Sequence, residues 1–254
     1  MSQLHFDELF APEVGPETKT VIRTQKKPVI SKLKATLTDH HKAFINEFRT
    51  LAPYHSRFEV FNDFTHIAVI ALENHFLKSP ELEEEYFNII GRYEKKDVEQ
   101  FSHLLAHVVL GLEREMCDFL GKIFMSLELG DSRMGQFFTP FHVSELMAKL
   151  IIGNPEPQIK QHGYITVSEP TAGAGGMVIA TAKILLEQGY NPSQHMLAVC
   201  TDIDITAARM CYVQLSLLGI PAIVNVGNSL ILTVSRVMKT PIYYLHHQRF
   251  ADWL

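Results

Sequence analysis

One short segment combines a carboxylate with a glycine-rich turn, a pattern that can bind a nucleoside. It runs Glu169-Pro-Thr-Ala-Gly-Ala-Gly-Gly-Met177, with an expected strand before it and an expected helix after it. Glycines let a ligand approach the backbone, and the start of a helix offers unpaired N–H groups and the positive end of its dipole. The spacing is not the G-x-G-x-x-G dinucleotide fingerprint, so the turn alone would equally suit a tight strand–helix connection.

Two further polar residues end the next two expected strands. Asp202 ends the second strand, where a carboxylate can accept hydrogen bonds from both hydroxyls of a ribose. Asn228 ends the third strand, and its amide suits either the adenine edge of a nucleoside or a simple turn. Ligands of doubly wound sheets bind at the carboxyl ends of the strands. Asp202 together with the glycine turn therefore favours a nucleoside cofactor.

An aromatic pair lies ahead of these strands, in Gly135-Gln-Phe-Phe-Thr-Pro140. A helix is expected directly after it, and both Pro140 and Ser144 are ordinary helix-start residues. A structural cap is therefore one interpretation of the segment. The other is that two aromatic rings beside polar residues form a wall of a cofactor pocket.

The spacing of apolar residues predicts the elements that position these groups. Residues 31–129 show helical spacing, which predicts a helical N-terminal domain of four or five helices. After Gly130, helices expected over 141–152, 176–188 and 206–218 alternate with strands expected over 164–168, 197–202 and 222–226. This alternation predicts an α/β domain with a parallel sheet over 130–254. Residues 1–30 are expected to be a flexible basic arm.

Composition excludes several classes of protein. The 254 residues are 46% hydrophobic and 20% charged, which is typical of a folded globular chain rather than a disordered, collagenous or coiled-coil one. Three cysteines without metal-ligand spacing disfavour a disulfide scaffold, and no metal site is expected. The sequence lacks a secretory leader pattern and an apolar run long enough to cross a bilayer. We therefore expect a cytoplasmic protein without a membrane segment.

The net charge of −5 conceals a basic stretch near the N-terminus. Such a stretch can lie along DNA phosphates, because each neutralised phosphate releases counterions, but it can equally be a solvated arm. The residues of this possible DNA-binding arm are Lys19, Arg23, Lys26, Lys27, Lys32 and Lys34.

Four elements in the same order carry a resemblance to a known family. Gly135–Pro140, Glu169–Met177, Asp202 and Gly227–Leu230 resemble the N6-adenine DNA methyltransferases, above all the methylase subunits of type I restriction-modification systems and short methylase-like proteins of plasmids and phages. The resemblance implies an α/β fold: a Rossmann-like S-adenosylmethionine-dependent methyltransferase sheet after an all-helical domain, in which C-terminal strands can be missing. It implies S-adenosylmethionine as the cofactor of the domain over 130–254.

The resemblance also assigns roles to individual residues. The segment Gln136–Phe141 would contact the methionine end of the cofactor, the glycine turn would approach it through the backbone, and Asp202 would bind the ribose. The full set of implied cofactor-binding residues is Gln136, Phe137, Phe138, Thr139, Pro140, Phe141, Glu169, Thr171, Gly173, Ala174, Gly175, Gly176, Asp202, Ile203 and Asn228.

The sequence departs from the family at its catalytic motif, Asn/Asp-Pro-Pro-aromatic, which occurs nowhere in the chain. In the family, that motif binds the amino group of a base that is flipped out of the duplex. Thr240-Pro-Ile-Tyr243 lies about where the motif is expected, so Thr240, Pro241 and Tyr243 are the candidate catalytic residues. An active role requires this segment to face the cofactor.

Three classes of function follow from these observations. The first is a restriction-modification DNA methyltransferase acting on adenine N6, with a specificity subunit or another protein partner for target recognition. The second is a catalytically silent regulatory or decoy subunit that binds the cofactor, because the catalytic motif is absent. The third is a methyltransferase for RNA, protein or a small molecule, because a cofactor site alone does not identify the acceptor.

Overall fold

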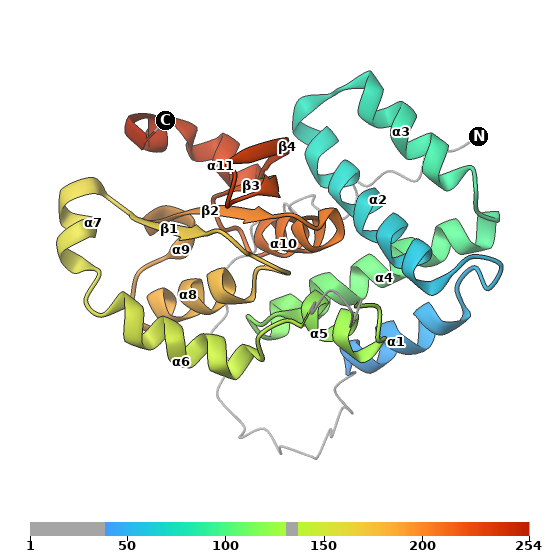
Figure 1. Cartoon of the computed structure of the whole chain (residues 1–254), viewed down its shortest axis with the longest axis horizontal. Coiled ribbons are helices and arrows are strands. Elements are labelled where there is room, and N and C mark those ends of the chain that lie inside the picture. The colour runs from blue at the N-terminus through green and yellow to red at the C-terminus, as the bar shows by residue number, and fades with distance from the viewer. Residues whose placement is uncertain (1–38, 131–136, 254) are drawn as a thin grey trace, which may run out of the picture. The chain divides into compact units, whose positions relative to one another are not determined.

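The computed structural model describes residues 39–130 and 137–253 (Figure 1). The basic residues Lys19 to Lys34 and the implied cofactor contact Gln136 lie outside the described residues. Within the described part of the chain, no helix is long and apolar enough to cross a membrane, and no three His, Cys, Asp or Glu side chains are grouped so that they could bind a metal ion.

Five helices form the first part of the described chain, as the apolar spacing predicts. Several begin where a short polar side chain accepts a hydrogen bond from a first-turn amide: Asp39 from Lys42 N, Ser56 from Glu59 N and Ser79 from Leu82 N. The helices are α1 (His40–Thr50), α2 (Arg57–Leu77), α3 (Pro80–Ile90), α4 (Lys95–Arg114) and α5 (Phe119–Ser126).

A sheet with flanking helices follows, close to the predicted boundaries. The strands, in the spatial order β1-β2-β3-β4, are β1 (Ile165–Glu169), β2 (Met196–Asp202), β3 (Ala222–Asn228) and β4 (Thr233–Lys239). The helices are α6 (Phe141–Ile152), α7 (Glu156–His162), α8 (Gly176–Glu187), α9 (Pro192–His195), α10 (Ile205–Leu217), α11 (Pro241–His246) and the 3-10 helix η3 (His247–Trp253). The first three strands are parallel, and β4 is antiparallel to β3.

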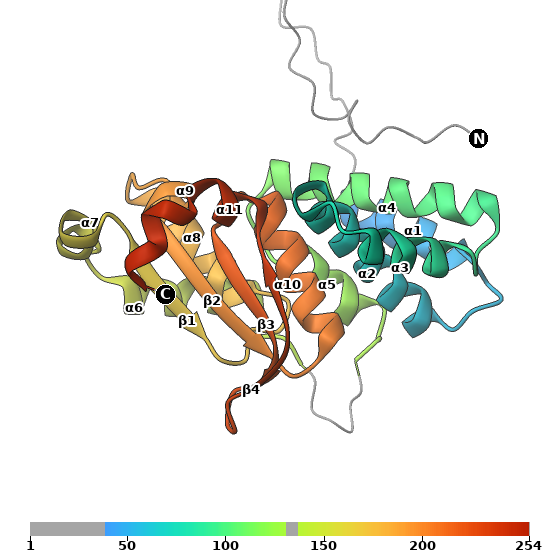
Figure 2. The ribbon, with the colours of Figure 1, turned by 90° about the horizontal axis from the view of Figure 1, so that it is seen from above.

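The strand alternation divides the buried residues of the sheet between two faces. On one face, Ala198 and Cys200 of β2 and Val224 of β3 belong to the main core, together with residues of α8 and α10. On the other face, Leu197 and Ile223 pack with side chains of α11 and η3. The sheet therefore lies between two helical layers, as an α/β fold requires (Figure 2).

Helix α10 joins the sheet to the N-terminal helices. Every residue from Thr206 to Leu215 is buried, so the helix has no solvent face over this stretch. Figure 2 shows α10 between the sheet and α2. One continuous hydrophobic core extends from Phe44 in α1 to Met238 in β4. Residues 38–254 thus form one compact unit, and the division into a helical domain over 31–129 and a cofactor-binding domain over 130–254 stays a prediction.

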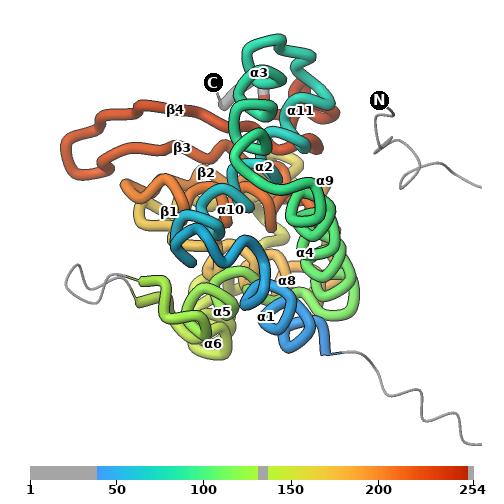
Figure 3. Tube along the Cα trace, turned by 90° about the vertical axis from the view of Figure 1, so that its right-hand side faces the viewer, coloured from blue at the N-terminus to red at the C-terminus, as the bar shows by residue number. Residues whose placement is uncertain are grey.

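The α/β class is confirmed, but strand β4 was not predicted. Most of its side chains are exposed, so it lacks the buried alternation that identifies a strand from sequence. Its position is set by pairing with β3, from Ile223 opposite Lys239 to Asn228 opposite Thr233. The β3–β4 hairpin extends past the other strands (Figure 3).

Candidate cofactor site

The glycine turn and Asp202 lie side by side at the carboxyl ends of β1 and β2. The Gly173 N–H donates to Asp202 Oδ2 at 2.7 Å, and the Asp204 N–H donates to Asp202 Oδ1 at 2.9 Å. These bonds orient the carboxylate, and each oxygen keeps a lone pair for a ligand hydroxyl. Burial raises the pKa of Asp202 above its usual value, and the backbone N–H donors oppose that rise.

The turn requires glycine at two of its positions. Gly173 has φ +54°, and a Cβ there would lie 2.9 Å from Phe138 Cδ1. Gly175 has φ +92°, and a Cβ there would lie 3.0 Å from Cys211 Sγ. Both positions combine a left-handed backbone with a close neighbour, which side chains other than hydrogen do not tolerate. The turn is therefore tightly packed against Phe138 and Cys211.

The start of α8 offers backbone N–H groups to a ligand. Gly175 is the N-cap, and no described side chain caps the helix. The first-turn amides of a helix have no partner inside the helix, and they prefer an acceptor with negative charge. Together with Asp202 they form a site with backbone donors on one side and a carboxylate on the other.

Phe138 links the aromatic segment to this site. Its ring packs over Gly173, and its centroid lies 5.4 Å from that of Phe124 in α5. Phe137 is exposed, as are Thr139 and Pro140. Pro140 also starts α6, since its carbonyl accepts from Val143 N at 2.8 Å. The segment therefore serves both as a helix start and as a wall beside the glycine turn.

The other implied contacts reach the same edge in different ways. Ile203, next to Asp202, is 70% exposed. Glu169 Oε1 accepts from Thr171 N at 3.3 Å and from Thr171 Oγ1 at 3.4 Å, which closes the end of β1. Asn228 Oδ1 accepts from Leu230 N and from Ile231 N, so this oxygen closes a turn of the hairpin.

The candidate catalytic residues Thr240, Pro241 and Tyr243 do not lie at this edge, so their catalytic role stays a prediction without support from their position. Thr240 follows β4 at the amino end of β3: its Oγ1 donates to Ile220 O and accepts from Ala222 N, both at 2.9 Å. Ala222 pairs with Ala198, which lies four positions before Asp202, or about 13 Å along the strand at 3.3 Å per residue. The antiparallel direction of β4 carries Thr240 away from the cofactor edge.

Tyr243 is buried in the core on the face of the sheet that α11 and η3 cover. It is 2% exposed and packs against Phe250 with a centroid distance of 6.1 Å. Pro241 is the first residue of α11, a usual position for proline at a helix start. The segment is therefore a buried connection between β4 and the second helical layer.

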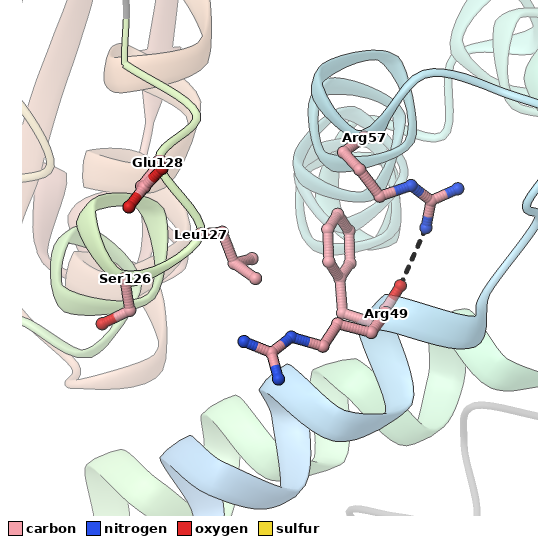
Figure 4. Close-up of a pocket in the computed structure, with 6 residues that line it drawn as sticks. Arg49, Arg57, Ser126, Leu127 and Glu128 are labelled. Atoms are coloured by element: carbon pink, nitrogen blue, oxygen red, sulfur yellow. Dashed lines mark hydrogen bonds between the residues drawn. The ribbon is translucent and has the colours of Figure 1, made fainter.

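Two cavities flank the helices, and neither includes the glycine turn. A cavity of about 680 Å³ lies where α5 faces the start of α6, with Phe138–Phe141 along one side and Asp118, Lys122 and Glu145 among the others. A cavity of about 320 Å³ is lined by Phe48, Arg49, Arg57, Ser126, Leu127 and Glu128 (Figure 4). In the smaller one, Arg57 donates to the carbonyls of Phe48, Leu51 and Ala52, so its guanidinium caps the end of α1.

Sequence reasoning missed two residues behind the glycine turn. Gln214 of α10 is fully buried, and its Nε2 donates to Ala174 O at 2.8 Å and to Asp118 Oδ1 at 2.9 Å. Asp118 also caps α5 by accepting from Gly121 N at 2.9 Å. A glutamine between the apolar residues Val213 and Leu215 was the available sign, because a buried amide needs partners.

Comparison with known families agrees with this site. Residues 122–239 match the family model described as N-6 DNA methylase. This segment is similar to the N-6 DNA methylases. It contains the aromatic segment, the glycine turn, Asp202 and Asn228, and it ends one residue before Thr240. The family match supports S-adenosylmethionine as the cofactor.

The sequence also has a similar solved structure. A crystal structure from Listeria monocytogenes, described as a class I S-adenosylmethionine-dependent methyltransferase, is 15% identical to this chain with a TM-score of 0.42. The similarity covers 72% of this chain and 50% of that one. No curated protein matches the sequence.

Proposed function

We propose that this chain binds S-adenosylmethionine at the carboxyl edge of β1–β3 and acts in DNA adenine-N6 methylation of the restriction-modification type, together with a partner that recognises the target. One observation carries the proposal. The Gly173 N–H···Asp202 Oδ2 bond of 2.7 Å joins the glycine turn to the acid at the end of β2, inside a segment similar to the N-6 DNA methylases.

The described residues fit this cofactor. The α8 amides and the bare backbone at Gly173 and Gly175 suit its methionine end, and Asp202 can accept from the ribose hydroxyls. Exposed Ile203 offers an apolar face for the adenine ring. When bound, S-adenosylmethionine supplies a methyl group that is activated by its sulfonium. The residues of this chain bind and orient it.

The acceptor needs groups beyond the described ones. The lone pair of an adenine amino group is delocalised into the ring, so the amine must be positioned before it can attack a methyl group. In the family, an Asn or Asp followed by two prolines binds that amine, and Thr240 is too far from the edge to replace it. We therefore expect a partner subunit to supply the amine-binding group as well as target recognition.

A second candidate function is favoured by the burial of Thr240. A chain that binds the cofactor but does not position an acceptor would act as a regulatory or decoy subunit. The hydrogen bonds of Thr240 Oγ1 go to backbone groups of Ile220 and Ala222, around the start of β3, and its side chain is fully buried. This arrangement supports a structural role for the segment that was expected to be catalytic.

Calorimetric titration of the full chain with S-adenosylmethionine tests the common part of both candidates. Micromolar binding that is lost in Asp202→Ala supports the cofactor site, and no binding by the folded protein overturns it. Tritiated methyl transfer to unmethylated DNA then separates the two candidates. Formation of N6-methyladenine supports the first, and binding without transfer in the presence of candidate partner subunits supports the second.

A further inference from the structure

Gln214 is the most completely bonded buried side chain near the glycine turn. It is 0% exposed, and its neighbours along α10, Val213 and Leu215, are apolar and equally buried. Its Nε2 donates to Asp118 Oδ1 and to Ala174 O, and its Oε1 accepts from Leu120 N at 2.9 Å. An unpaired buried amide is costly, so these bonds explain how the polar side chain is tolerated.

The bond to Ala174 fixes one peptide plane of the turn. The Ala174 carbonyl accepts from Gln214 at 2.8 Å, and the N–H of the same peptide group, that of Gly175, donates to Ala172 O at 2.8 Å. Because a peptide group is planar, two bonds at its opposite ends fix its orientation. Gly175 is the N-cap of α8, so this orientation also sets the direction of the first amides of the helix.

The other two bonds of Gln214 reach α5. Asp118 caps α5, and Leu120 lies in its first turn. Burial raises the pKa of Asp118, while the donors Gln214 and Gly121 oppose that rise. Helix α5 also carries Phe124, which packs behind Phe138. One carboxamide therefore connects the turn to the helix that supports its aromatic wall.

We propose that Gln214 is a positioning residue that attaches the glycine turn to α5 and so preorganises the α8 amides for the cofactor. That the ligand is S-adenosylmethionine rests on the proposed function. That Gln214 orients the turn rests only on its hydrogen bonds. The proposal adds a role for a side chain that does not itself touch the cofactor.

The first test is Gln214→Met, which keeps the length of the side chain and removes its donors and acceptor. We expect the dissociation constant for S-adenosylmethionine to rise at least tenfold in calorimetry. We also expect faster hydrogen exchange of the amides between Ala172 and Met177 without cofactor. The control is Val69→Ala in α2, a fully buried change away from the turn, which should lower the melting temperature and leave both readouts unchanged.

Replacing Gln214 by glutamate makes cofactor binding depend on pH, which is not expected if the side chain has only a structural role. In Gln214→Glu, a carboxylate faces Asp118 Oδ1 and Ala174 O, so binding should weaken at pH 8 and recover in part at pH 5.5, where a protonated carboxyl can donate. The double variant Asp118→Asn/Gln214→Glu restores the donor–acceptor pair between positions 118 and 214 with the roles exchanged, while Ala174 O stays without its side-chain donor. It should fold and bind more tightly than Gln214→Glu alone at pH 8.

Several outcomes would overturn the inference. One is an unchanged dissociation constant and unchanged exchange in Gln214→Met. Another is a Val69→Ala variant that has the same melting temperature as Gln214→Met and shows equal changes in the dissociation constant and in hydrogen exchange. A third is a double variant that binds the cofactor no more tightly than Gln214→Glu at pH 8. If wild-type protein does not bind the cofactor, the proposed function fails, but hydrogen exchange of the turn still decides the role of Gln214.

Discussion

The two ends of the sheet differ in what their polar atoms bind. At the carboxyl end, Asp202 is half-buried, Ile203 is exposed, and the α8 amides have no capping side chain among the described residues. At the amino end, Thr240 is fully buried with its hydrogen bonds made inside the protein, and Tyr243 packs in the core. A site that binds a ligand has hydrogen-bond donors and acceptors without protein partners, whereas the polar atoms of a structural site are bonded within the protein.

The comparison also shows that position along the sequence and position in the fold are different criteria for a site residue. Thr240-Pro-Ile-Tyr243 lies near the expected catalytic motif along the sequence, but the antiparallel β4 places it at the wrong end of the sheet. Asp202 lies far from the glycine turn in sequence and next to it in space. Three variants test the comparison between the two ends of the sheet, and a fourth tests a buried histidine of the helical region.

The largest expected effect is at the carboxyl end, in Asp202→Ala. Hydrogen bonds to a charged group contribute about 1.5–3 kcal/mol each, so loss of the ribose bonds should weaken cofactor binding by about 100-fold, or about 3 kcal/mol. Calorimetry measures this change. Asp204→Ala is the matched control: it removes a carboxylate that caps α10 through Ala207 N, so it should lower stability and keep the affinity. Equal affinities in the two variants would contradict the assignment.

Gly175→Ala should have the next largest effect, on the free energy of unfolding. A side chain at φ +92° costs about 1–2 kcal/mol, and the contact of its Cβ with Cys211 Sγ adds about 1 kcal/mol. Gly189→Ala is the control, because Gly189 has φ +87° and nothing within 4 Å of its Cβ position. Urea denaturation of both variants isolates the packing contribution. If the two variants unfold alike, the turn is not tightly packed on α10.

Thr240→Val addresses the amino end and should reduce stability by about 1–2 kcal/mol, because it leaves Ala222 N without its side-chain acceptor. Cofactor affinity should not change. Thermal unfolding and calorimetry on the same preparations measure the two quantities. A large loss of cofactor affinity with an unchanged free energy of unfolding would mean that Thr240 contributes to cofactor binding, and it would contradict the difference between the two ends.

The smallest effect concerns His41 of α1, which lines the cavity of about 680 Å³ together with Phe138–Phe141. Burial, with a contribution from Lys122, lowers its pKa to about 4, and its ring stacks on Phe119 at 4.0 Å. A lowered pKa means that the stability from the neutral ring is complete above about pH 6.5 and is lost as the pH falls toward 4. In His41→Phe the melting temperature should fall less steeply over that range. Parallel pH profiles for wild type and variant would contradict this account.

Local patterns made much of the fold predictable. The helix Phe141–Ile152 has the bounds that the apolar spacing predicts. The strands that end at Asp202 and Asn228 lie within two residues of their predicted bounds. These elements have strong periodicity and clear end signals, which act over a few residues. β4 could not be predicted in the same way, because its mostly exposed side chains carry no periodic pattern.

The sequence alone determined the residue types of the cofactor site and their order along the chain. Glycines, an acid and helix-start amides imply a nucleoside site wherever strands and helices alternate, because backbone geometry places strand ends together. Only the tertiary structure decided which groups remain free to bind. It used the Thr240 hydroxyl in internal bonds, and it brought Gln214 from α10 behind the turn. Those outcomes depend on contacts between distant segments, and no local pattern encodes them.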